Sequence, residues 1–330
     1  MTVRLTVSRA QWDAHVQACA TAYGPGLVAV VKGNGYGLGR PFLHEIVHGL
    51  HPNPAANLVC IGTVHELHDV PGALTPVVLT PGLAPPQPRA NTSPAAPILT
   101  IGSIAHVQAL AGWTGQVLVK LASSMRRYGA HPDELPAVLA TAEAAGLQVV
   151  GHGLHLPLAG HDADRIAEID GWLPHLATDL PLWVSHLEPE SFAALRDAHS
   201  ARTFRIRVGT ALWHGVPRRP FLHLTADVVH TQPVHAGQHA GYFHTRVPHD
   251  GTLVAIGGGT AHGIALLDDT DPARRSPFHF ARHRLPLLER PHMHTTVAIV
   301  PKGQPSPQVG DRVDVQRPLI TTQVDEVEWV

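Results

Sequence analysis

The chain is poor in the residues on which several classes of protein depend. Among its 330 residues there are two cysteines, Cys19 and Cys60, too few for a disulfide framework or a cysteine-based zinc site. No segment approaches the roughly 18 consecutive apolar residues that a membrane helix needs, and the first residues lack an apolar stretch of signal-peptide length. We therefore expect a cytoplasmic protein with no membrane partner.

Charge is also sparse. The formal net charge is −2, and 15% of the residues are charged. Such a chain offers no basic field for nucleic acid and no run of like charges typical of an interaction tail. Histidine is abundant, with 26 copies, but no spacing of histidines and carboxylates is typical of a metal site. We expect a small-molecule partner, no nucleic acid and no metal.

Lysine is also rare, since the chain has three, at Lys32, Lys120 and Lys302. Arginine replaces lysine wherever a surface cation is enough, so a retained lysine indicates a role that arginine cannot fill. Schiff-base formation is such a role, since arginine stays protonated.

The apolar pattern predicts an α/β fold. Amphipathic stretches such as residues 131–145 and 163–177 have helical periodicity and separate short, β-branched runs. The eight runs are Leu27–Val31, Leu58–Ile61, Val77–Thr80, Ile98–Ile101, Val117–Leu121, Gln148–His152, Leu182–Ser185 and Phe204–Val208. Eight strands alternating with helices predict a (β/α)8 TIM-like barrel over residues 11–220, with its active site at the carboxyl ends of the strands.

The pattern changes after about residue 220. Short alternating segments broken by Gly, Pro and His follow, without a long helix. We expect a mostly-β domain over residues 221–330, with residues 1–10 as a candidate addition. The length of the chain suits a large barrel with a smaller second domain.

The strongest local signal is VAVVKGNGYGLG, residues 28–39, where an apolar strand runs into Lys32 and a glycine-rich turn. A lysine at the barrel mouth with apolar neighbours is a candidate for Schiff-base chemistry, because desolvation lowers the pKa of its amine and favours the neutral form. From the residues alone, a phosphate-binding loop or a structural turn is at least as well supported, since glycine-rich turns after strands are common.

The segment VVKGNGYGLG resembles the motif VVKANAYGHG of alanine racemases, a family of pyridoxal 5'-phosphate enzymes with a barrel and a C-terminal β domain. The resemblance implies that pyridoxal phosphate is the cofactor, that Lys32 forms the internal aldimine with it and that Tyr36 binds its phosphate. Leu38 stands where the family has a histidine.

The segment VLVKLASSMRRYG, residues 117–129, resembles the family's LKVDTGMGRLG. By that resemblance Lys120 falls on the lysine that is often carbamylated, and an ordinary ion-pairing lysine is an equal alternative. Arg127 falls on the arginine that contacts the phenolic oxygen of the cofactor and lies near the substrate. Ala122 and Ser124 replace the Asp and a Gly of the motif.

Three further strand ends carry matches to the family. GLHLP aligns His155 with the THFA histidine, and WVSHL aligns Ser185 with the NSAA serine that helps bind phosphate. RIRVGTALWHG resembles VRPGIALYG, which implies that Arg207 faces the pyridine nitrogen and that the amides of Gly209 and Thr210 hold phosphate.

The C-terminal region resembles the family at a methionine position but differs from the family at the position of its catalytic tyrosine. ERPHMHTTVAIV resembles GRVSMDQTMVDL, so Met293 takes the substrate-side methionine position. In IGGGTAHGI, Thr260 stands where the family's GYADG motif has its catalytic tyrosine.

Because the family's site is shared between subunits, we expect a homodimer with shared active sites. The candidates for the missing second base are His262 and His294, since imidazole is a competent acid and base near neutral pH.

Three functions follow from the resemblance and its departure. The first is a racemase that acts at the α-carbon of a small amino acid through the Lys32 aldimine, with a substituted second base. The second is a pyridoxal-phosphate lyase, an aldolase or a decarboxylase on the same scaffold, which needs no second base. The third is a noncatalytic cofactor-binding protein.

Overall fold

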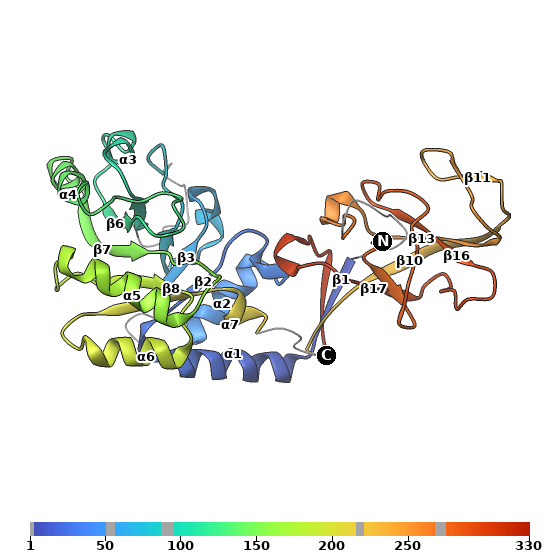
Figure 1. Cartoon of the computed structure of the whole chain (residues 1–330), viewed down its shortest axis with the longest axis horizontal. Coiled ribbons are helices and arrows are strands. Elements are labelled where there is room, and N and C mark those ends of the chain that lie inside the picture. The colour runs from blue at the N-terminus through green and yellow to red at the C-terminus, as the bar shows by residue number, and fades with distance from the viewer. Residues whose placement is uncertain (1–2, 51–56, 87–95, 216–220, 268–274) are drawn as a thin grey trace. The chain divides into compact units, whose positions relative to one another are not determined.

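The computed structural model describes residues 3–50, 57–86, 96–215, 221–267 and 275–330 (Figure 1). Its contacts divide the chain into two compact units. The barrel unit holds residues 14–35 and 40–215, and the β unit holds residues 1–13, 36–39 and 216–330. None of the described helices combines the length and apolar character that crossing a membrane requires.

Eight parallel strands form the barrel unit, as predicted. In the sheet they stand in the order β4-β3-β2-β9-β8-β7-β6-β5, and a bridge between Val77 and Ile98 joins the two ends, which closes the barrel. The strands are β2 Leu27–Val30, β3 Leu58–Ile61, β4 Thr75–Val78, β5 Leu99–Ile101, β6 Gln116–Leu121, β7 Gln148–Leu154, β8 Leu182–Ser185 and β9 Phe204–Val208.

Helices cover the outside of this barrel (Figure 1). They are α1 Arg9–Tyr23, α2 Arg40–Gly49, α3 Ile104–Ala109, α4 Leu135–Ala144, α5 Asp162–Trp172, α6 Pro189–Ala198 and α7 Thr210–Trp213. A short 3-10 segment, η4 Val64–Asp69, connects β3 to β4. The helix predicted from residue 131 begins only at Leu135, because residues 131–134 form a turn in which Glu134 accepts the amide hydrogen of His131 at 2.9 Å.

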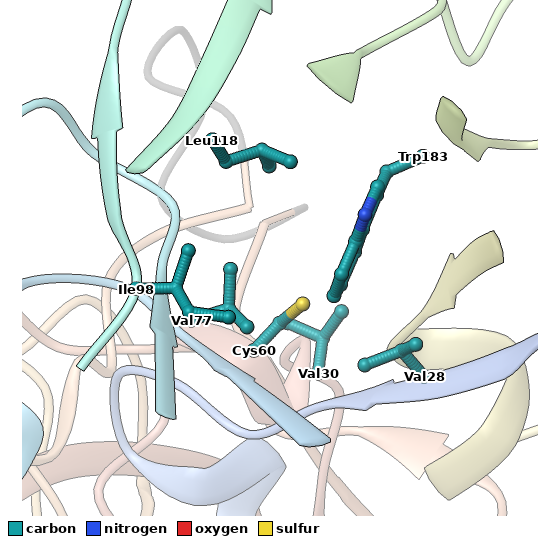
Figure 2. Packing of buried hydrophobic residues seen from close by; sticks show 7 residues of the cluster. All are labelled: Val28, Val30, Cys60, Val77, Ile98, Leu118 and Trp183. Atoms are coloured by element: carbon teal, nitrogen blue, oxygen red, sulfur yellow. The ribbon is translucent and has the colours of Figure 1, made fainter. Parts of the chain in front are cut away.

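The barrel is filled by side chains from its strands. Val28 and Val30 of β2, Cys60 of β3, Leu118 of β6 and Trp183 of β8 are buried in one cluster. Figure 2 shows the indole ring of Trp183 pointing toward Cys60. Removing each such aliphatic side chain from water stabilises the fold by about 1.5–3 kcal/mol. Burial raises the pKa of the Cys60 thiol to about 12, so this cysteine acts as a core residue and not as a nucleophile.

The β unit begins with the N-terminal strand. β1 Val3–Val7 pairs antiparallel with β10 Leu222–Val234 and parallel with β18 Glu326–Trp329. β10 is long enough to pair also with β13 and β17. The remaining strands are β11 His239–Ala240, β12 Thr245–Arg246, β13 Gly251–Ile256, β14 Phe278–Phe280, β15 His283–Arg284, β16 Thr296–Pro301 and β17 Arg312–Val315. This confirms the mostly-β character expected after residue 220.

Candidate active site

Lys32 follows the carboxyl end of β2 and opens to solvent at the mouth of the barrel. Partial burial lowers the pKa of its amine, and the nearby guanidinium groups of Arg127 and Arg207 lower it further, while the Glu66 carboxylate acts in the opposite sense. A lowered pKa increases the fraction of neutral amine, which is the form that attacks a carbonyl carbon.

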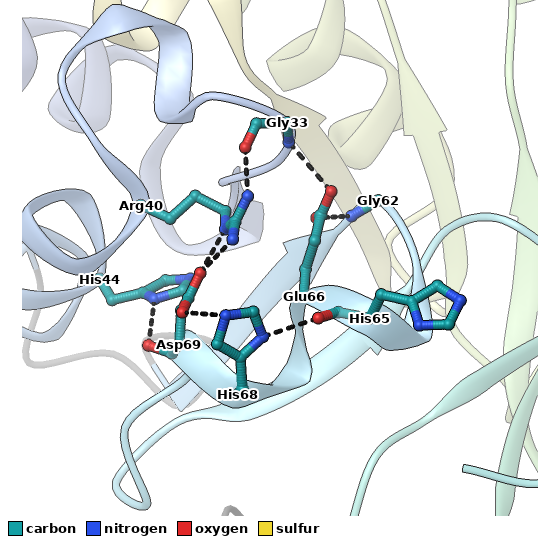
Figure 3. Close-up of polar contacts among 8 residues, drawn as sticks. All are labelled: Gly33, Arg40, His44, Gly62, His65, Glu66, His68 and Asp69. Carbon is teal, nitrogen blue, oxygen red and sulfur yellow. Dashed lines mark hydrogen bonds and ion pairs between the residues drawn. The ribbon is translucent and has the colours of Figure 1, made fainter. Parts of the chain in front are cut away.

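The turn after Lys32 is held by two carboxylates of η4 (Figure 3). Glu66 accepts the amide hydrogen of Gly33 at 3.1 Å and that of Gly62 at 2.7 Å. Arg40 donates to the Gly33 carbonyl and pairs with Asp69, with Nε 2.6 Å from the carboxylate. Both the amide N–H and the carbonyl oxygen of Gly33 are therefore bonded to charged side chains.

Steric constraints explain why this turn contains glycine. Gly35 has a φ of 64°, in the left-handed region, and a Cβ there would overlap the backbone nitrogen of Arg40. Tyr36 also has a left-handed backbone, with a φ of 57°, and its side chain is buried. It belongs to the segment 36–39 that groups with the β unit.

Lys120 and Arg207 are buried basic residues inside the barrel. Lys120 in β6 is 4% exposed, and burial together with Arg207 and Arg127 holds its pKa well below that of a free lysine. No carboxylate of the described residues lies within ion-pair distance of Lys120. Arg207 at the end of β9 donates from Nη2 to the Leu154 carbonyl at 3.0 Å. Its Nε is buried without a partner among the described residues.

His155 and Ser185 lie together at the ends of β7 and β8. The Ser185 hydroxyl oxygen is 2.9 Å from Nδ1 of His155 and accepts the amide hydrogen of Leu156 at 3.1 Å. Burial, reinforced by Arg207, lowers the pKa of His155 to about 2. The imidazole is thus neutral across the physiological range. Gly209 and Thr210 lie at the start of α7, after β9.

The β unit brings the C-terminal candidates into a cluster of their own. Thr260, an exposed residue, donates its amide hydrogen to the His292 carbonyl at 2.7 Å, and Ala261 donates to Met293 at 2.9 Å. Met293 is 65% exposed. The rings of His262 and His294 are 5.8 Å apart.

His262 and His294 differ in how freely their rings can act. His262 is buried, with Nε2 3.2 Å from the Asp325 carboxylate, and its Nδ1 accepts the Gly259 amide hydrogen at 3.2 Å. His294 is exposed. Both ring nitrogens of His262 are therefore occupied in holding the β unit together, which favours a structural role for it.

The sequence of the barrel unit identifies the family. A family model of the alanine racemase N-terminal domain matches residues 7–217, more than half of the chain. The chain belongs to the alanine racemase family. No curated protein matches it by sequence.

Solved alanine racemases share the family fold along the whole chain. The enzyme from Bartonella henselae with covalently bound pyridoxal phosphate superposes with a TM-score of 0.70 at 17% identity, covering 100% of both chains. The enzyme from Corynebacterium glutamicum gives 0.69 at 18% identity, covering 100% of this chain and 99% of that chain. The enzyme from Clostridium difficile 630 gives 0.69 at 15% identity, covering 100% and 96%.

Motif comparison with the alanine racemase family missed three residues of the mouth that the structure shows. Glu66 and Asp69 come from η4, which carries no family motif. His186 directly follows Ser185, and its ring lies 5.1 Å from that of His155. A polar residue at the carboxyl end of a barrel strand is a signal that could have identified His186.

Proposed function

We propose that the protein is a pyridoxal-phosphate-dependent racemase that acts at the α-carbon of a small amino acid, with Lys32 as the lysine that holds the cofactor. The observation that carries this proposal is the pairing of a Lys32 amine of lowered pKa with a buried Arg207 whose Nε lacks a partner among the described residues. A buried donor without a partner is rare in folded proteins and fits a ligand that accepts its hydrogen bond.

The residues of the mouth fit pyridoxal phosphate in charge and chemistry. Its phosphate would be held by Tyr36, Ser185, Gly209 and Thr210, as the family motifs imply. Arg207 would face the ring nitrogen, and Arg127 would face the phenolic oxygen. The guanidinium groups of Arg127 and Arg207 bring positive charge to the mouth, which favours an anionic ligand. When bound, the cofactor withdraws electrons from the bonds at the substrate α-carbon.

Three side chains of the barrel unit then have separate roles in the reaction. The neutral Lys32 amine removes or returns the α-proton on its side of the substrate. Arg207 stays protonated and offers only donors, so it keeps the facing ring nitrogen unprotonated and restrains side reactions. His155, neutral and bonded to Ser185, adds a dipole without adding positive charge.

Racemisation needs a second proton-transfer group on the opposite face of the substrate. Thr260 occupies the family's tyrosine position, but a threonine hydroxyl holds its proton too tightly to act as a comparable base. Of the histidines beside it, His294 has the more accessible ring, and His262 is bonded at both nitrogens. We propose a homodimer with shared active sites. A monomer at micromolar concentration contradicts the homodimer.

A lyase is the second candidate function, and Thr260 is the observation that favours it. An aldolase or decarboxylase breaks a different bond of the α-carbon and can act without a base on the second face. Incubating the protein with D- and L-amino acids in deuterated water separates the two. A racemase exchanges the α-proton and inverts both enantiomers, whereas a lyase releases a side-chain fragment or carbon dioxide.

A further inference from the structure

The chain has four tyrosines, which differ in their surroundings. Tyr23 is buried, and its hydroxyl donates to the Leu187 carbonyl at 3.0 Å. Tyr36 is the tyrosine that the family motif assigns to phosphate. Tyr242 is 82% exposed in the β unit. The fourth, Tyr128, lies in the barrel unit and stands where the family's GRLG segment has a leucine.

Tyr128 lies in a loop on the wall of the barrel opposite Lys32. The loop leaves the carboxyl end of β6 and returns beside it, because Ala122 donates to the Ala130 carbonyl and Ala130 to that of Lys120, both at 2.9 Å. In the closed barrel, β6 is four strands away from β2 in either direction. Lys32 and the Tyr128 loop therefore approach the mouth from opposite walls.

The phenol of Tyr128 has a cation beside it. Arg127 donates from Nη2 to the phenol oxygen at 3.1 Å, and its guanidinium carbon lies 4.6 Å from the ring centre. The phenol hydroxyl is 3.5 Å from the Leu79 carbonyl, just beyond β4, which is a weak hydrogen bond. The hydroxyl is thus loosely held, and any negative charge left on its oxygen has a positive partner.

The histidines of the mouth are poorly suited to deliver a proton. Burial lowers the pKa of His155 to about 2 and that of His186 to about 4, so neither carries a second proton near neutral pH. A phenol keeps its proton at that pH and can give it to a strongly basic carbon.

We propose that Tyr128 is the second proton-transfer group, acting on the face of the substrate opposite Lys32; this inference rests on the proposed racemase function. In one direction, the C–H bond breaks and the Lys32 amine takes the proton. The electron pair left at the α-carbon forms a new C–H bond with the phenol proton of Tyr128, whose oxygen becomes negative beside Arg127. Proton exchange with water returns Lys32 and Tyr128 to their starting states.

The test compares Tyr128→Phe with Tyr242→Phe and His294→Ala, all as cofactor-loaded protein. Deuterium incorporation at the α-carbon of D- and L-alanine is followed in deuterated water. We expect Tyr128→Phe to load cofactor normally and to exchange one enantiomer at the wild-type rate. Exchange of the other enantiomer and inversion should fall at least about 100-fold, as expected for loss of a general acid and base. Tyr242→Phe should behave as wild type.

A second measurement does not depend on turnover. Tyrosine nitration by tetranitromethane, mapped by mass spectrometry, should modify Tyr128 and Tyr242 in the free protein. Cofactor with alanine should protect Tyr128 and leave Tyr242 reactive. Unchanged nitration of Tyr128 overturns the proposal.

The other outcomes are equally distinct. Wild-type exchange of both enantiomers in Tyr128→Phe overturns the assignment of Tyr128 and leaves the racemase proposal standing. The assignment of Tyr128 is also overturned if His294→Ala or Tyr242→Phe loses exchange of one enantiomer while Tyr128→Phe exchanges both like wild type. The racemase proposal stands in that case too. If the wild-type protein loads no cofactor or exchanges no amino acid, the proposed function fails, and the role of Tyr128 fails with it.

Discussion

The amide hydrogen of Gly33, the residue directly after Lys32, is bonded to the carboxylate of Glu66 at 3.1 Å (Figure 3). The other oxygen of this carboxylate accepts the Gly62 amide hydrogen at 2.7 Å. Glu66 therefore ties together the segments that follow β2 and β3. Its negative charge also opposes the lowering of the Lys32 pKa.

Glu66→Gln should weaken cofactor binding without unfolding the barrel. The amide side chain places a donor against a backbone N–H, so one of the two bonds is lost, which costs on the order of 1 kcal/mol at these exposed and part-buried contacts. The pKa of Lys32 should fall further, because a neighbouring negative charge is removed. Cofactor release on dilution, followed by absorbance, should become at least about tenfold faster. Glu45→Gln, on the exposed face of α2, is the matched control, and equal release from the two variants contradicts this role of Glu66.

Lys120 should carry a carbamate. Its amine is buried, and burial with Arg207 and Arg127 keeps the pKa low, so the neutral amine is available to attack carbon dioxide. The carbamate's negative charge would then meet the same two arginines. Carbon-13 NMR of protein prepared with labelled bicarbonate should show a carbamate signal that is absent from Lys120→Met and present in Lys302→Met, where the replaced lysine is exposed. A signal in Lys120→Met would contradict the assignment.

His152 should make the protein less stable in acid. It is 1% exposed in β7, and both ring nitrogens are buried without a partner among the described residues. Burial lowers its pKa from 6.5 to about 4. Between these values the unfolded chain binds more protons than the folded one, so the free energy of unfolding falls as the pH drops from about 6.5 to 4.

The size of this effect follows from the shift. His152 should account for on the order of 3 kcal/mol of lost stability by pH 4. Urea unfolding at pH 7 and pH 4.5 should therefore show a smaller loss for His152→Leu than for wild type. His48→Leu, at an exposed position of α2, should keep the wild-type loss. An unchanged pH dependence in His152→Leu would show that His152 is not the group responsible.

His262→Ala should lower stability while leaving inversion of alanine intact. The variant removes the contact with Asp325 and leaves the Gly259 amide without its acceptor, at a cost of about 1–3 kcal/mol. Urea unfolding measures the first effect, and inversion at a temperature well below the transition measures the second. Loss of inversion at unchanged stability would instead identify His262 as the second base.

The sequence predicted the barrel strands well for a physical reason. Parallel barrel strands are buried on both faces, so a segment such as Leu58–Ile61 is continuously apolar and stands out. Helix ends were less accurate, since the turn at residues 131–134 has the composition of a helix start. The strands of the β unit were not predicted individually, because β10 runs through Pro233 and pairs with several partners.

The sequence could offer candidate site residues where they lie in contiguous motifs, as for Lys32 and Arg207. The site was not predictable where a contact joins distant segments. Glu66 is 33 residues from Gly33, and only the folded chain brings the two together. The same holds for the pairing of Thr260 with His292, which the sequence places 32 positions apart.

The central claim is that Lys32 holds the cofactor, and the small number of lysines makes it directly testable. Protein loaded with pyridoxal phosphate is reduced with borohydride, digested and mapped by mass spectrometry. We predict a yellow protein whose absorption band is bleached and whose cofactor mass is found on the peptide carrying Lys32, and on neither Lys120 nor Lys302. Lys32→Ala should retain no cofactor after reduction, while Lys302→Ala should match wild type. Cofactor fixed to Lys120 or Lys302 in the wild-type protein, or retained by Lys32→Ala, would contradict the account.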